Sequence, residues 1–274
     1  MTAPTTDRAA ALPSVVSVSR SRARVELKEF FRQREAVVFT VLLPVLLLTV
    51  FGAVLNYDIG SGVTFVQYFM AGIIAAGILG ASLQNMAISI ATERSDGTLK
   101  ALAGTPMPKS AFFVGKVVQV LAVTVLIIGV LLLIGVVFYG IDLPSGAEWI
   151  TFTWVALLGA AACTLLGIAV SSLAKNGRSA SAVVTPFALV LQFISGVFFL
   201  FSSLPAWMQT VAAVFPLKWM GQGLRSVFLP DALAASEPAG SWELGRVALV
   251  LGIWCVAGLA LCVLTFRWQD RSAS

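Results

Sequence analysis

Residues 93–116 read Glu-Arg-Ser-Asp-Gly-Thr-Leu-Lys-Ala-Leu-Ala-Gly-Thr-Pro-Met-Pro-Lys-Ser-Ala-Phe-Phe-Val-Gly-Lys, a polar segment between two very apolar stretches. A hairpin turn would need far fewer residues. Leu99, Leu102 and Ala103 follow helical spacing, so we predict a short helix from about Gly97 to Ala103 with a small apolar ridge. Proline disfavours helix before and within itself, so Thr105-Pro106-Met107-Pro108 should end this helix. A short helix with such a ridge indicates a docking surface.

The composition on either side of this segment is that of a membrane protein. Hydrophobic residues make up 58% of the 274 residues and charged residues 11%, whereas soluble domains carry about 25% charged residues. Six uncharged runs each reach the roughly 20 residues that a membrane-spanning helix needs. These runs are residues 36–57, 59–92, 117–141, 149–174, 179–217 and 247–266. We therefore predict an all-α membrane protein with a cytoplasmic tail and interfacial helix (residues 1–35) and a domain of six transmembrane helices (residues 36–274).

The basic residues predict how the chain is oriented. With a cytoplasmic N-terminus, 15 of the 18 Lys and Arg residues lie on the inner side, and only Lys218, Arg225 and Arg246 lie outside. This asymmetry is what the positive-inside rule expects. Both termini are then cytoplasmic, the protein is a multi-pass protein of the inner (plasma) membrane, and its net charge of +5 faces anionic lipid rather than nucleic acid. A signal peptide is not expected, because the first apolar run is long enough to span.

Two further segments are predicted at the membrane surfaces. From about Arg20 to Glu35 an apolar helical face lies beside a basic stripe, which indicates an interfacial helix on the inner leaflet. The apolar positions are Ala23, Leu27, Phe30 and Phe31. A solvated charged leader is the alternative, but it would expose two adjacent phenylalanines. Residues 1–19 are expected to form a loose tail. Residues 204–217 are too short to cross, so they should enter the outer face and return as a re-entrant segment, with residues 218–246 remaining outside.

The second and fifth runs hold most of the amide side chains that lie within spans. Gln84, Asn85, Gln192 and Ser195 are candidates for a substrate path, and hydrogen bonding between helices is the alternative for the amides. The fifth run closes near the outer surface with a bulky cluster from Val197 to Phe201. On a two-fold axis each residue meets its own copy, so Val197, Phe198 and Phe199 are candidates for an outer gate. Packing of these phenylalanines against the re-entrant segment is the alternative.

The residues for catalysis, metal binding and nucleotide binding are missing from the sequence. The chain has no histidine, which excludes the usual His-based metal sites and acid–base catalysis. Its cysteines lie in spans without metal-ligand spacing. Gly115-Lys116 could end a phosphate loop, but Ser110 replaces the first glycine and Val117 replaces the magnesium-binding Ser or Thr. We expect a protein that is not an enzyme, with no catalytic residue, metal or bound cofactor, driven by a partner.

Two groups of residues resemble the motifs of the ABC type 2 permeases, the family that includes the daunorubicin-resistance permeases. The first group is similar to the family's coupling-helix region: Glu93-Arg94, Gly97-Thr98-Leu99, Leu102, Thr105-Pro106 and Gly115-Lys116. The second is similar to its signature around the fifth span: Phe193 to Phe199, Leu204 to Trp207, Pro216-Leu217 and Arg225. Ser95 and Lys100 stand where the family often has acidic residues.

This resemblance implies a six-span half-transporter that dimerises with a second copy or a related permease. It implies that each copy docks one separate ATPase subunit, two in all, which bind the ATP and Mg. The implied docking residues are Glu93, Arg94, Gly97, Thr98, Leu99 and Leu102. The second and fifth spans would line the path between the copies.

The expected substrate is hydrophobic or amphipathic, because the path candidates are neutral amides and serines among apolar residues. An exporter of a drug-like compound or a lipid is the first reading, and an exporter of a lipid-linked glycan is an alternative. A membrane scaffold or channel without an ATPase is the alternative from another class, although no charged or carbonyl-rich filter is evident.

Overall fold

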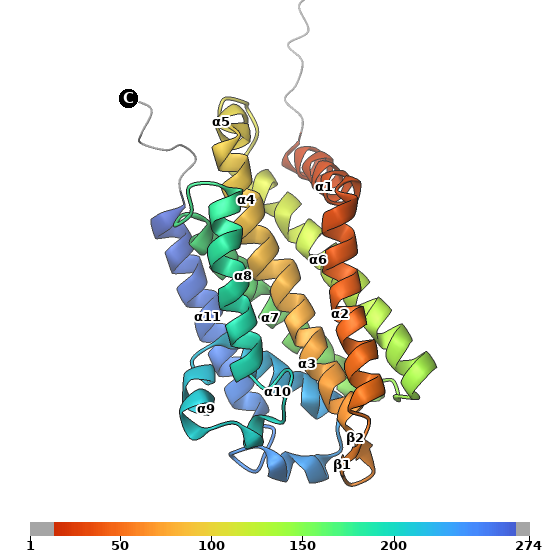
Figure 1. Cartoon of the computed structure of the whole chain (residues 1–274). Coiled ribbons are helices and arrows are strands. Elements are labelled where there is room, and N and C mark those ends of the chain that lie inside the picture. The colour runs from red at the N-terminus through yellow and green to blue at the C-terminus, as the bar shows by residue number, and fades with distance from the viewer. Residues whose placement is uncertain (1–13, 267–274) are drawn as a thin grey trace, which may run out of the picture.

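The computed structural model describes residues 14–266, and most of them are helical (Figure 1). Within these residues, six stretches of helix are long and apolar enough to cross a membrane. They are α2 (Arg34–Val54), α3 continuing into α4 (Phe65–Leu79 and Asn85–Ser95), α6 (Lys109–Tyr139), α7 (Gly146–Ser171), α8 (Gly177–Ile194) and α11 (Leu244–Thr265). The predicted all-α membrane fold is confirmed.

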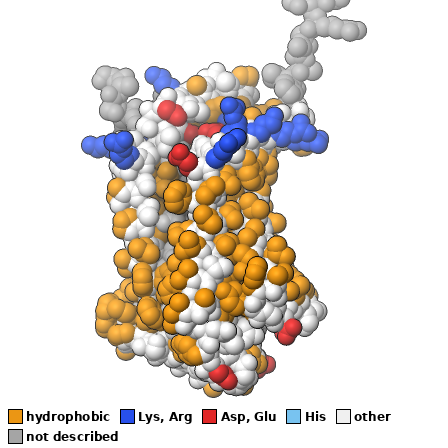
Figure 2. All heavy atoms as spheres, turned by 45° about the vertical axis from the view of Figure 1, so that its right-hand side comes forward, with side chains coloured by type: hydrophobic (Ala, Val, Ile, Leu, Met, Phe, Trp, Pro, Cys, Tyr) orange, Lys and Arg blue, Asp and Glu red, His pale blue; other side chains and the backbone are white. Residues whose placement is uncertain are grey.

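The two ends of the bundle differ in charge and in their short elements. One end carries α1 (Val15–Arg32) and α5 (Thr98–Ala103), and lysine and arginine side chains gather there (Figures 1 and 2). We call it the basic end. The far end carries a hairpin of β1 (Asp58–Gly60) and β2 (Val63–Thr64), the short helices α9 (Ala206–Ala212) and α10 (Pro216–Phe228), and two 3-10 turns (Phe201–Ser203 and Asp231–Ser236).

The first helix packs along α6 with its apolar face inward. Ala23 and Phe30 are buried there, whereas Phe31 is about half exposed at 48% and the basic stripe of Arg24, Lys28 and Arg32 is exposed. The predicted amphipathic pattern is therefore present, but α6 covers much of its apolar face. The loose tail predicted for residues 1–19 is wrong from Val15 on, where the helix begins after its N-cap Ser14; residues 1–13 lie outside the described part.

The centre of the bundle is α3, in which every residue except Gln67 is buried. Small residues on this helix allow close approach by its neighbours. A Cβ on Gly72 would lie 3.0 Å from the carbonyl oxygen of Val197, so the segment after α8 can rest directly on α3. A π-helical turn (Gly80–Gln84) joins α3 to α4, and π turns often occur at functional sites. The predicted second span is thus one interrupted helix that continues to Ser95.

The inserted element at the far end is α10, so the predicted boundary of the re-entrant segment is wrong. Eleven of its 13 residues are buried, between α3, α7 and α11. Lys218 and Arg225 belong to this helix, although they were expected outside. Each is stabilised by local partners: Lys218 donates to Gln222 Oε1 and lies over the Trp219 ring, and Arg225 pairs with Glu237. Burial lowers the pKa of Lys218 to about 8.

Candidate functional site

The helix α5 projects from the basic end on a turn that the local sequence specifies (Figure 1). Gly97 adopts a left-handed backbone with φ +84°, which glycine reaches without steric cost. Thr98 N donates to Asp96 Oδ1 at 2.9 Å, which fixes the turn into the helix. At the other end, Thr105 Oγ1 donates to Leu102 O at 2.7 Å before the two prolines. The predicted short helix and its proline stop are confirmed.

The two leucines of the apolar ridge of α5 face this chain, whereas Ala103 is exposed. Leu99 is fully buried in an apolar cluster with Met86 and Ile90 of α4 and Phe112 of α6, and Leu102 packs at its edge. The prediction that Leu99 is presented to a partner is wrong, because the ridge anchors α5 to its own bundle. The exposed surface of α5 and its following turn is formed by Lys100, Ala101, Ala103, Gly104 and Thr105.

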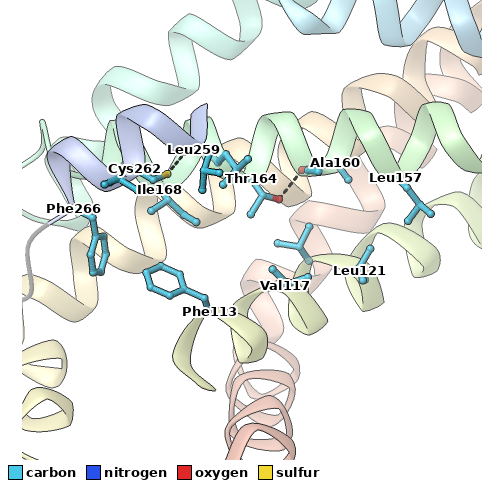
Figure 3. Close-up of a pocket in the computed structure, with 14 residues that line it drawn as sticks. Phe113, Val117, Leu121, Leu157, Ala160, Thr164, Ile168, Leu259, Cys262 and Phe266 are labelled. Carbon is cyan, nitrogen blue, oxygen red and sulfur yellow. Dashed lines mark hydrogen bonds between the residues drawn. The ribbon is translucent and has the colours of Figure 1, made fainter. Parts of the chain in front are cut away.

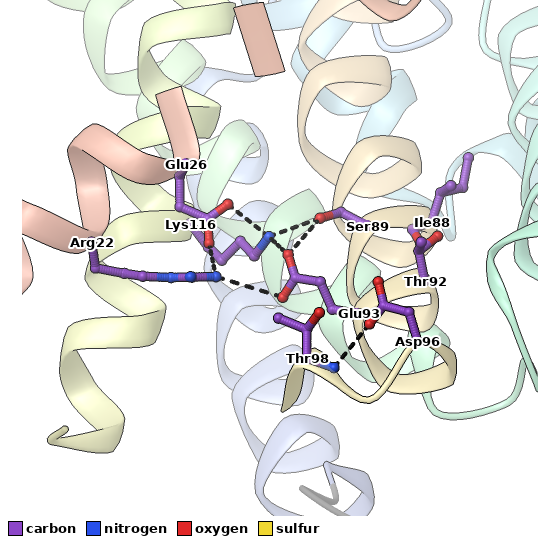
Figure 4. Close-up of polar contacts among 9 residues, drawn as sticks. All are labelled: Arg22, Glu26, Ile88, Ser89, Thr92, Glu93, Asp96, Thr98 and Lys116. Carbon is purple, nitrogen blue, oxygen red and sulfur yellow. Dashed lines mark hydrogen bonds and ion pairs between the residues drawn. The ribbon is translucent and has the colours of Figure 1, made fainter. Parts of the chain in front are cut away.

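Beneath α5, a buried charge network joins α1, α4 and α6 (Figure 4). Lys116 Nζ donates to Glu26 Oε2 at 2.8 Å, to Ser89 Oγ at 2.8 Å and to Glu93 Oε1. Arg22 pairs with Glu26 and lies 3.7 Å from Glu93 Oε2. The side chains of Lys116, Glu26 and Glu93 are at most 6% exposed. Arg22 and Lys116 therefore neutralise Glu26 and Glu93 with little access to water, and the exposed Glu29 places a carboxylate oxygen within 4.8 Å of theirs.

This network corrects the roles predicted for Glu93 and Arg94. Glu93 is an internal ion-pair partner and offers no exposed charge to a second protein. Arg94 Nη1 donates to Ser171 O at 2.9 Å and its Nη2 to Ser171 Oγ at 3.2 Å, so it ties α4 to the end of α7. Gly97 and Thr98 remain partly exposed beside the free face of α5. Binding of an ATPase by Gly97 or Thr98 stays a prediction.

The candidate path residues are distributed between the π-helical turn and the end of α8. Gln84, Asn85 and Gln192 are each partly buried. Ser195 is 1% exposed, and its Oγ has no hydrogen-bond partner among the described residues. Within a single copy Ser195 therefore faces the interior of the chain, whereas the three amides keep part of their surface accessible.

The gate candidates separate into buried and exposed residues. Val197 and Phe198 are buried, and the Phe198 ring packs against Phe51 and Phe69 with centroids 5.9 and 6.1 Å apart. Gly196, with φ +73°, turns the chain so that this segment folds back against α3. Phe199 alone of the three is exposed, at 49%. A gate role for Val197 and Phe198 at a dimer axis is thus contradicted, and Phe199 remains the candidate.

A second buried ion pair, Arg225–Glu237, joins α10 to the loop before α11. Arg225 is completely buried; its Nε donates to Glu237 Oε1 at 2.7 Å, and its guanidinium lies 5.0 Å from the Tyr68 ring centroid. Phe201 N donates to the Tyr68 hydroxyl at 2.9 Å. The loop before α11, the helix α10, the central helix α3 and the segment after α8 are therefore linked through Arg225 and Tyr68.

The model of the ABC-2 type transporter family matches residues 22–229, from within α1 to the end of α10. The chain belongs to the ABC-2 type transporter family. The resemblance found in the motifs is confirmed, and membership makes the chain a transport permease rather than a catalytic enzyme. The residues that resemble the family's coupling-helix region lie in α4, α5 and the start of α6.

Individual relatives of this permease are distant. Putative transport permease YvfS of Bacillus subtilis (strain 168) is 22% identical over 208 residues, covering 76% of this chain and 84% of that protein. Inner membrane transport permease YadH of Escherichia coli (strain K12) is 26% identical over 209 residues, covering 74% and 80%. Probable multidrug ABC transporter permease YbhR of Escherichia coli (strain K12) is 28% identical over 149 residues, covering 53% of this chain and only 39% of that protein.

The sequence did not predict that several residues of the Lys116 network and of the Arg225–Glu237 pair are buried and paired. Arg22 and Glu26 carried no individual prediction, and Lys116 was considered only in the coupling-helix motif and a possible phosphate loop. One signal was present: Glu26 falls on the same helical face as Ala23 and Phe30, and an acid on the apolar face of a basic helix predicts a buried cation partner. Nothing comparable marks Glu237, because its partner Arg225 lies in the stretch that was predicted to remain outside.

Proposed function

We propose that this permease is the membrane subunit of an ATP-driven exporter, and that the basic end lies in the cytoplasm and binds an ATPase at the exposed face of α5. The observation that carries the proposal is the attachment of α5. Leu99 anchors the helix in a buried cluster, while its opposite face remains exposed. A short helix held in this way can transmit a conformational change from a bound partner to the bundle.

The buried charge network couples movement of α5 to the rest of the bundle. Force on α5 acts on α4 through the short turn at Asp96 and Gly97, and the Glu93–Lys116–Glu26 contacts tie α4 to α6 and α1. The three helices are then expected to move as one unit at the basic end. Because α4 continues through the π-helical turn into α3, the movement reaches the place where Val197 rests on Gly72. ATP and Mg belong to the partner in this scheme.

A second permease copy completes the exporter in this proposal. The described surfaces of α2 and α8 are apolar and largely uncovered, with Phe39, Val183 and Phe187 among the exposed side chains. Pairing two copies across α2 and α8 would place Gln84, Asn85 and Gln192 beside a shared path, with Phe199 at its far end. A path of neutral amides and phenylalanines suits a hydrophobic or amphipathic molecule, drug-like or lipid, taken from the cytoplasm or inner leaflet.

The test is co-purification of this permease with a co-expressed ABC ATPase subunit. Ala101→Arg adds a long cation to the exposed face of α5 without touching the Leu99 cluster, so we expect it to abolish ATPase capture and transport. Ala147→Arg is the matched control, because Ala147 is also exposed but lies at the far end. Both variants should remain monodisperse with unchanged melting. Normal ATPase capture by Ala101→Arg would refute docking at this face, and transport without any ATPase would favour a channel.

A further inference from the structure

A long apolar groove lies on the side of the bundle between α6, α7 and α11 (Figure 3). Its volume is about 640 Å³. The lining comes from Phe113 to Leu121 of α6, Leu157 to Ile168 of α7 and Leu259 to Phe266 of α11. These are the halves of the three helices nearest the basic end. Leu157, Leu259 and Val263 on its walls are 52% to 77% exposed, so the groove opens sideways, where the membrane would be.

The chemistry of the lining selects an apolar occupant. Two lining residues have polar side chains, and both are satisfied within α7: Thr164 Oγ1 donates to Ala160 O at 2.6 Å and Cys262 Sγ donates to Leu165 O at 3.0 Å. No side-chain donor in the groove is left for a ligand. An alkyl chain gains contact here without having to strip water from a polar group.

The dimensions of the groove match one leaflet of a bilayer. From Leu157 to Ile168 the groove follows α7 for about 16 Å at about 1.5 Å per residue, close to half of the roughly 30 Å hydrocarbon core. At the basic end Phe113 meets Phe266 with ring centroids 5.2 Å apart, in an edge-to-face pair that joins α6 to α11 (Figure 3). A chain that enters from the side can therefore lie along α7 beneath this pair.

The charge around the basic end of the groove is complementary to a phosphate group. Lys109 begins α6 four residues before Phe113, and its side chain is exposed. The sequence has no Asp or Glu between Asp96 and Asp142 or between Glu148 and Asp231. The stretches that supply the α6 and α7 walls therefore carry basic residues and no acid, although Lys116 is already neutralised by Glu26 and Glu93. Anionic headgroups are favoured beside such residues by about fivefold for each basic group.

Part of the groove lining belongs to the apolar cluster in which Leu99 of α5 is buried. Val120, Ile168 and Cys262 line the groove and belong to the same apolar cluster that buries Leu99. An acyl chain in the groove would therefore pack against the same apolar cluster that contains Leu99. An empty groove would leave these residues without contacts on one side.

From these observations we propose that one acyl chain of an anionic phospholipid, from the leaflet at the basic end, occupies this groove and supports the apolar cluster in which Leu99 of α5 is buried. Binding of the lipid does not depend on the proposed ATPase partnership; only its effect on coupling rests on that function.

The test uses the full chain in nanodiscs of phosphatidylcholine alone or mixed with phosphatidylglycerol, each with a trace of the same lipid carrying a photoreactive acyl chain. Crosslinked peptides are then mapped by mass spectrometry. With phosphatidylglycerol we expect labelling to concentrate on residues 113–121, 157–168 and 259–266. Ala161→Trp fills the floor of the groove and should lower this labelling about tenfold, equivalent to about 1.4 kcal/mol.

Two further variants distinguish blocking of the groove from an unspecific effect of the added tryptophan on folding or labelling. Ala260→Trp is the control, because Ala260 is exposed on α11 at the same depth but does not line the groove, and it should label like the parent. Val263→Trp blocks the groove from α11 and should repeat the effect of Ala161→Trp if that variant folds poorly.

Three results would overturn the proposal. The first is labelling spread evenly over the lipid-facing helices, and the second is equal labelling by phosphatidylcholine. The third is displacement of the label by a transported compound, which would make the groove a substrate site. If lipid binding is confirmed but removal of phosphatidylglycerol leaves ATPase coupling unchanged, the support of α5 is refuted while the binding site stands. Loss of ATPase capture in every lipid would instead count against the proposed function.

Discussion

At the scale of single residues, Lys116 holds the basic end together because it is the shared partner of two buried acids. Glu26 comes from α1 and Glu93 from α4, and neither carboxylate has much access to water. A buried pair contributes little over an apolar replacement, but removal of one member leaves an uncompensated charge. The network is therefore a device for fixing which helices meet, more than a large source of stability.

Replacing Lys116 with Met should cost about 3–5 kcal/mol of unfolding free energy, because Glu26 and Glu93 would then face each other with only Arg22 nearby. Chemical unfolding in mixed micelles measures this cost. Adding Glu93→Gln to Lys116→Met should recover part of it, since one of the unpaired charges is removed. Lys100→Met is the control on the exposed face of α5 and should change stability by less than about 0.5 kcal/mol. A loss for Lys116→Met no larger than the control's would show that the network is not buried as described.

At the scale of elements, α1 shows how one amphipathic helix divides its apolar residues between protein and membrane. Phe30 is 4% exposed against α6, whereas the adjacent Phe31 is 48% exposed. Their side chains contact each other edge to face at 5.4 Å, so the pair spans the boundary. The two residues are identical in kind and differ only in what covers them.

The stability costs of substituting these phenylalanines should differ for that reason. Phe30→Ser removes a buried ring and should lower the unfolding free energy by about 3–5 kcal/mol. Phe31→Ser loses at most the partial burial of one ring, below about 1.5 kcal/mol. Thermal melting of the two variants in the same detergent measures the difference. Equal losses would mean that α1 is not seated on α6 in the membrane.

The elements also show which features the sequence could predict. The spacing of Leu99 and Leu102 predicted α5 correctly, because periodicity and turn residues act locally. The spacing could not predict which surface the two leucines contact, since a helix beside a membrane domain can bury an apolar face in its own chain or in a partner. The helix α10 was misplaced for a related reason. Lys218 has a local partner in Gln222 one turn along the same helix, but the partners of Arg225, Glu237 and Tyr68, come from elsewhere in the fold.

At the scale of the whole molecule, composition alone predicted six spans, but not which of their faces remain uncovered. The length and hydrophobicity of each span can be read from the sequence. Which helices lie next to it depends on side-chain packing between segments far apart in the chain. The structure leaves α2 and α8 uncovered on one side and the groove beside α11 on another. We assign α2 and α8 to a second permease copy and the groove to lipid. The two surfaces must respond differently to crosslinking.

Cysteine crosslinking at the far end distinguishes these surfaces. In a background lacking Cys163, Cys255 and Cys262, Phe199→Cys should form a disulfide between copies in the resting state, because Phe199 is exposed and would meet its own copy on a two-fold axis. Such a bond requires Cα atoms within about 7 Å.

Two further cysteine variants make this crosslink interpretable. Phe198→Cys should fail, since that side chain packs against Phe51 and Phe69 in its own chain. Val137→Cys tests another face: Val137 is 64% exposed near the far end of α6, away from the proposed axis, and it should also fail. A crosslink at Val137 without one at Phe199 would move the dimer axis to α6 and remove the basis for a Phe199 gate.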